Sequence, residues 1–92
     1  MKASEKTEIT RLIGTFRLEE AKMILQHIIG INPADDEAFL LMGHIYRKRS
    51  QWQEALQAYA QAMELNPDSP ARHARQMISE IMDFYDKERY NV

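Results

Sequence analysis

The chain has no cysteine, which excludes a disulfide framework, a thiolate nucleophile and a cysteine-ligated zinc site. Its three histidines show neither a His-x3-His nor a His-Glu-x2-His spacing, so we expect no metal site. A Gly-x-Ser-x-Gly elbow, a glycine-rich phosphate-binding loop and a recognisable nucleophile–base pair are missing too. We therefore predict that the chain is not an enzyme and uses no cofactor.

Basic charge and long apolar runs are also scarce. A formal net charge of −2 gives no electrostatic reason to bind nucleic acid or an anionic membrane surface. No apolar stretch approaches the roughly 20 residues that cross a bilayer, and no apolar run follows the first residues as in a signal peptide. These absences predict a cytoplasmic protein with no nucleic-acid or membrane partner.

What the chain does have is helical periodicity over almost its whole length. Hydrophobic residues make up 45% and charged residues 28% of its 92 residues, a composition typical of one soluble domain. Apolar residues recur at helical spacing in five segments, at about residues 4–14, 18–29, 36–49, 52–65 and 70–86. Ser4, Asp35 and Ser69 stand where N-caps are expected.

Residues 36–67 carry a specific spacing of large and small side chains. It reads Phe39-x2-Met42-Gly43-x2-Tyr46, followed by Ala55-x3-Tyr59, Ala62 and Pro67. This stretch resembles the tetratricopeptide repeat, whose 34-residue signature is W-x2-L-G-x2-Y…A-x3-F…P. A shift of 34 residues places Asn32-Pro33 on Asn66-Pro67 and Glu20-Ala21 on Glu54-Ala55, so a degenerate copy precedes the full one.

The resemblance implies an all-α fold, a right-handed α-α superhelix of about five antiparallel helices in a single domain. Residues 2–35 would form the degenerate repeat, 36–69 the full repeat, 70–86 a capping helix and 87–92 a tail. The ending from Phe84 to Asn91 is similar to that of small bacterial proteins built around one such repeat. The family usually has glycine where Ser50 and Phe16 stand, so a positive φ at that turn would strain both residues.

By the same resemblance, a partner binds in a shallow groove lined by the first helix of each pair. The predicted partner-binding residues are Glu37, Leu40, His44, Arg47, Lys48, Arg75, Ile78 and Met82. Two alternatives stay open. Leu40 and Leu41 are core residues in one of them, and Arg47-Lys48-Arg49 is a solvated helix end that offsets the helix dipole in the other. Thr10 and His44 stand where carboxylate-clamping members have asparagine, so we do not expect that clamp.

The predicted function is a protein–protein interaction module, or adaptor, that binds a peptide or a partner protein. The alternative is a self-assembling, homodimeric structural protein. About three repeats are normally needed for stability, and this chain has only two and a half. Tyr85, Tyr90 and Val92 would then pack on a second copy, or on the chain's own groove until a partner displaces them.

Overall fold

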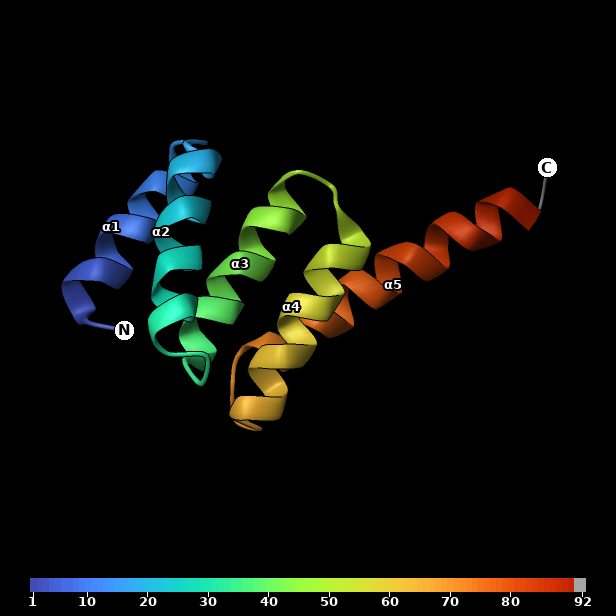
Figure 1. Ribbon diagram of the computed structural model, residues 1–92. Coiled ribbons are helices and arrows are strands. Elements are labelled where there is room, and N and C mark those ends of the chain that lie inside the picture. The colour runs from blue at the N-terminus through green and yellow to red at the C-terminus, as the bar shows by residue number, and fades with distance from the viewer. Residues whose placement is uncertain (91–92) are drawn as a thin grey trace.

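The computed structural model describes the backbone of residues 1–90 and the side chains of residues 1–84. This part of the chain forms five helices and no strand: α1 (Ala3–Gly14), α2 (Leu18–Ile31), α3 (Asp36–Lys48), α4 (Trp52–Leu65) and α5 (Ala71–Tyr90). Successive helices run antiparallel, and α5 begins against α4 and continues away from the body (Figure 1). The predicted all-α fold is confirmed.

The ends of the helices follow their capping residues. Asp35 accepts a hydrogen bond from the backbone N–H of Ala38, at 3.2 Å, and Ser69 accepts one from that of Ala71, at 3.1 Å. Both predicted caps are confirmed. The prediction for Ser4 is wrong, because α1 begins one residue earlier and its N-cap is Lys2. At the other end of the chain, α5 continues to Tyr90, four residues beyond its predicted end.

The core consists of two clusters that share α3. One joins α1, α2 and α3 and includes Ile9, Leu25, Leu41 and Ile45, while the other joins α3, α4 and α5 and includes Leu40, Tyr59, Ala62, Ala74 and Ile78. The helix α3 therefore needs apolar side chains on two sides, which explains why its sequence is apolar on more than one face.

The two helix pairs are closed by the same kind of turn. Phe16, between α1 and α2, has φ 61°, and Ser50, between α3 and α4, has φ 58°. Both lie in the left-handed region, where a side chain costs free energy that glycine avoids. The predicted positive φ at these two positions is confirmed.

A close approach between α3 and α4 depends on Gly43. A Cβ atom placed on Gly43 would lie 2.4 Å from Cε1 of Tyr59, far inside van der Waals contact. The Tyr59 side chain is fully buried, so its ring lies directly on the backbone of α3. Glycine is required here by lack of space, as its place in the sequence pattern predicted.

Candidate functional site

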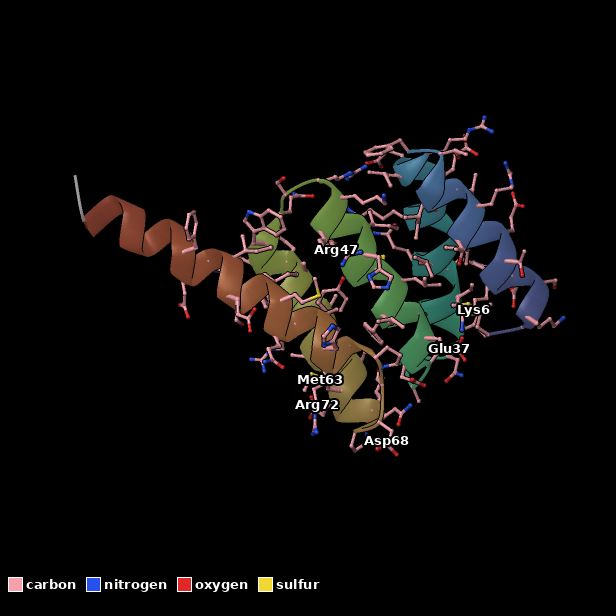
Figure 2. The ribbon with its side chains drawn as sticks, turned by 180° about the vertical axis from the view of Figure 1, so that it is seen from behind. Lys6, Glu37, Arg47, Met63, Asp68 and Arg72 are labelled. Atoms are coloured by element: carbon pink, nitrogen blue, oxygen red, sulfur yellow. The ribbon has the colours of Figure 1, made fainter. Side chains whose placement is uncertain are left out.

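The exposed side of α3 carries several of the predicted partner-binding residues. The Glu37 carboxylate pairs with the ammonium group of Lys6 on α1 at 3.0 Å, and both side chains are about half exposed. Figure 2, which views the molecule from behind, shows Lys6, Glu37 and Arg47 on this side. His44 lies between Glu37 and Arg47 along the helix. We call Lys6, Glu37, His44 and Arg47 the α3 face.

The basic run at the end of α3 divides into three separate roles. The guanidinium of Arg49 pairs with Glu19 on α2, and the ammonium of Lys48 lies 4.9 Å from the ring centroid of Phe16. Arg47 is half-buried and has no carboxylate partner among the described side chains. Of the three cations, Arg47 is therefore the one whose charge the fold leaves unused.

Three of the predicted residues do not lie on an open surface. Leu40 is only 8% exposed and Ile78 is fully buried, and both belong to the cluster between α3, α4 and α5. Met82 is half-buried against the same cluster. The prediction that Leu40 and Ile78 offer side chains to a partner is corrected, because α5 packs over the first and turns the second inward.

The rotation of α5 explains this correction. It packs back on the preceding pair through Ala71, Ala74 and Ile78, the same spacing with which Ala38, Leu41 and Ile45 pack α3 on α1 and α2. The two sets are 33 residues apart, whereas the apolar pattern of the sequence aligned best at 35. Each residue of offset rotates a helix by about 100°. The exposed apolar side of α5 is accordingly formed by Met77, Ile81 and Phe84.

At the offset of 33 residues, Met77 corresponds to His44 and Ile81 corresponds to Lys48. We infer from this equivalence that Met77 and Ile81 extend the α3 face onto α5. Sequence reasoning missed both residues. Arg75 stays exposed, as predicted, but on a different side of α5 from these two.

The most specific polar contact at the α3 face joins His44 to Tyr59 on α4. The imidazole Nδ1 lies 2.6 Å from the phenol oxygen, and the two rings meet edge to face at 5.5 Å. Burial, with the nearby Arg47 and Lys48 charges, lowers the pKa of His44 to about 4. Burial also raises the pKa of Tyr59 to about 12. Both groups are therefore uncharged at neutral pH.

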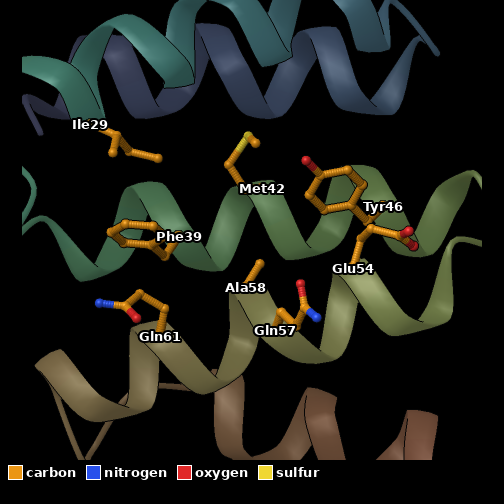
Figure 3. A pocket seen from close by; sticks show the side chains of 8 residues that line it. All are labelled: Ile29, Phe39, Met42, Tyr46, Glu54, Gln57, Ala58 and Gln61. Carbon is orange, nitrogen blue, oxygen red and sulfur yellow. The ribbon is translucent and has the colours of Figure 1, made fainter.

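A second candidate site lies between α2 and α4, on the side that Figure 1 presents. It is a hollow of about 460 Å³, with Phe39, Met42 and Tyr46 of α3 at its base. Figure 3 shows its other lining residues, which are Ile29 on α2 and Glu54, Gln57, Ala58 and Gln61 on α4. Sequence reasoning treated Phe39 and Tyr46 as covered by the partner helix. Both stay half-buried because α2 and α4 do not close over them.

Metal and membrane sites were tested against the described residues only. Among these residues no group of three or more histidine, cysteine, aspartate or glutamate side chains is placed to hold a metal ion. None of the described helices has the length and apolar character needed to cross a bilayer.

The geometry of two helix pairs and a fifth helix can be compared with known proteins. A family model described as tetratricopeptide repeat matches residues 37–69. The fold is similar to the solution NMR structure of a Bacteroides fragilis protein, with a TM-score of 0.85 and 43% sequence identity over 99% of this chain and 91% of that one. The chain belongs to the tetratricopeptide repeat family. None of the curated proteins compared with it matches. Tetratricopeptide repeats generally mediate protein–protein interactions and are generally not catalytic.

Proposed function

We propose that this tetratricopeptide repeat protein is an adaptor that binds a segment of a partner protein across the α3 face. The observation that carries the proposal is Arg47, a half-buried cation without a carboxylate partner among the described side chains. A cation left unpaired by the fold can bind a carboxylate or a backbone carbonyl of a ligand through charge-assisted hydrogen bonds. Glu37, His44, Lys48 and Arg75 stay in the proposed set.

The apolar part of the proposed surface comes from α5. Met77 is 45% exposed and Ile81 is 37% exposed, and both would lie beside the α3 face at the offset described above. Apolar side chains of a bound segment would contact these two residues while its polar groups meet Arg47. The preferred partner is thus an extended segment that combines apolar side chains with acceptor groups. A cytoplasmic location stays part of the proposal.

Selection from a random peptide library tests this function. Peptides selected on the wild-type chain should bind an Arg47→Glu variant at least about tenfold more weakly, because the variant reverses the charge that meets the acceptor. Arg72→Glu is the matched control, since it makes the same charge change at an exposed position near the start of α5 (Figure 2). Peptides that bind both variants equally well would place the binding site elsewhere.

The second candidate function is self-assembly, and the exposed apolar stripe on α5 favours it. Met77, Ile81 and Phe84 lie at helical spacing, and Phe84 is 61% exposed. Apolar patches of this kind often mark protein–protein contacts. The side chains of Tyr85 and Tyr90, and the whole of Val92, lie outside the described residues, so their predicted part in a dimer stays a prediction.

Light scattering across a dilution series separates the two candidates. Self-assembly through α5 predicts a dimer that Ile81→Asp converts to a monomer and that Ser79→Asp, a control at an exposed polar position of the same helix, leaves intact. A wild-type molar mass that stays that of a monomer at every concentration would refute self-assembly and leave the adaptor function in place.

A further inference from the structure

Tyr59 differs from the residue that the repeat signature contains at its position. The signature has phenylalanine there, and this chain has a tyrosine whose side chain is fully buried. A buried hydroxyl is unfavourable unless it makes a hydrogen bond. The Tyr59 hydroxyl makes one, with Nδ1 of His44 at 2.6 Å. The hydroxyl thus adds a contact with the α3 face that packing of the ring does not require.

The direction of this hydrogen bond follows from the partners available. His44 is the one hydrogen-bond partner of the Tyr59 hydroxyl among the described residues. If Nδ1 carried the proton and donated it, the phenol proton would be enclosed without an acceptor. If the phenol donates to Nδ1, both groups are satisfied. The second arrangement places the proton of the neutral imidazole on Nε2.

The Nε2 atom of His44 is open to a ligand. Among the described residues it makes no hydrogen bond. It is also not enclosed, because the one described side-chain nitrogen or oxygen that is buried without a hydrogen bond is Oδ2 of Asp35, which pairs with the α-ammonium of Met1 instead. The geometry therefore points one N–H group of His44 away from Tyr59 and toward solvent.

We propose that Tyr59 fixes His44 as a neutral Nε2–H donor, and that this donor binds a backbone carbonyl oxygen of the partner segment. The binding step rests on the proposed function, whereas the fixed tautomer does not. A neutral donor suits a carbonyl beside Arg47, because Arg47 and Lys48 on the same helix already supply the positive charge. Tyr59, on the facing helix, is uncharged at neutral pH as well. Recognition by His44 should therefore not depend on its protonation near neutral pH.

The fixed tautomer can be measured on the free chain. A multiple-bond 1H–15N correlation spectrum distinguishes Nε2–H from Nδ1–H imidazole, and the wild-type chain should show Nε2–H for His44. Tyr59→Phe keeps the ring and removes the hydroxyl, so the spectrum of His44 should change to that of exchanging tautomers with a pKa nearer the ordinary 6.5. A wild-type Nδ1–H signal, or a Tyr59→Phe spectrum identical to wild type, would overturn the proposal.

Binding of a library-selected peptide then tests the donor. His44→Phe should weaken the peptide about threefold to tenfold, the effect of one neutral hydrogen bond. The wild-type affinity should stay constant between about pH 5 and pH 7.5, while the affinity of Tyr59→Phe should change over that range. Equal binding by wild type and His44→Phe would overturn the donor even if the tautomer is found. Failure to select any peptide would overturn the proposed function and the binding step, while the tautomer measurement still decides the role of Tyr59.

Discussion

Replacing Gly43 by alanine tests the contact that holds α3 and α4 together. The new Cβ would lie 2.4 Å from Cε1, 2.5 Å from Cδ1 and 2.9 Å from Cζ of Tyr59. The ring cannot move easily, because it is fully buried and its hydroxyl is bonded to His44. The substitution must therefore shift the two helices apart or force Tyr59 from its rotamer.

Two opposing effects set the magnitude. Overpacking of a well-packed core costs about 1–3 kcal/mol. Alanine in place of glycine within a helix gains about 1 kcal/mol. We expect a net loss of about 1–2 kcal/mol for Gly43→Ala, or about 5–15 °C in melting temperature for a domain of this size. Thermal melts followed by circular dichroism, with urea titration as a second measure, would show it.

Gly30 provides the matched control. It also lies within a helix, but nothing stands within 4 Å of the Cβ that alanine would add. Gly30→Ala should therefore raise stability by about 0.5–1 kcal/mol. In a Tyr59→Leu background, which removes the ring, Gly43→Ala should likewise change from destabilising to neutral or stabilising. Equal destabilisation by Gly43→Ala in both backgrounds would refute the steric argument.

Four further substitutions have defined outcomes. Ser50→Gly should raise stability by about 0.5–1 kcal/mol in urea titration, because it removes a side chain from a φ of 58°. Leu40→Asp should lose most helical circular dichroism at 25 °C, because it buries a carboxylate at a position that is 8% exposed; a folded variant would show that α5 does not cover Leu40. Lys6→Met should change stability by less than about 0.5 kcal/mol, because its ion pair with Glu37 is half exposed. Wild type should lose about 1–2 kcal/mol between pH 6.5 and pH 4 relative to His44→Gln, after allowance for partial exposure. The sign follows because the unfolded chain takes up a proton on His44 in this range while the folded chain, with a pKa of about 4, does not; parallel pH curves would contradict it.

The helix pair could be predicted because local rules decide it. Gly43 and Ala55 are small where the helices approach, and Asp35 begins α3 by capping. Ser50 adopts the left-handed conformation that glycine usually supplies, and this too was predicted from position alone. These features depend on neighbours a few residues away or on one recurring contact, so the sequence pattern contains them.

The candidate site was predicted only where it lies on α3. Its α5 residues were assigned incorrectly because an offset of two residues rotates a helix by about 200°. That offset moved Ile78 from the predicted surface into the core and left Met77 and Ile81 exposed instead. The hollow above Phe39 and Tyr46 depends on the separation of α2 from α4. Neither the docking of α5 nor that separation is encoded in the periodicity of one helix.

Tyr59 shows how a departure from a repeat signature can be read physically. Phenylalanine would fill the same space against Gly43, so the core gains nothing from the hydroxyl. What the hydroxyl adds is one hydrogen bond, and that bond reaches His44 on the α3 face. Departures that leave packing unchanged and add a polar contact are expected at functional sites. The same ring lies on Gly43 and holds the imidazole, so a change at Gly43 should be visible at His44. Gly43→Ala should therefore raise the pKa of His44 toward 6.5 even in the folded fraction, because it displaces the hydroxyl that keeps the imidazole neutral.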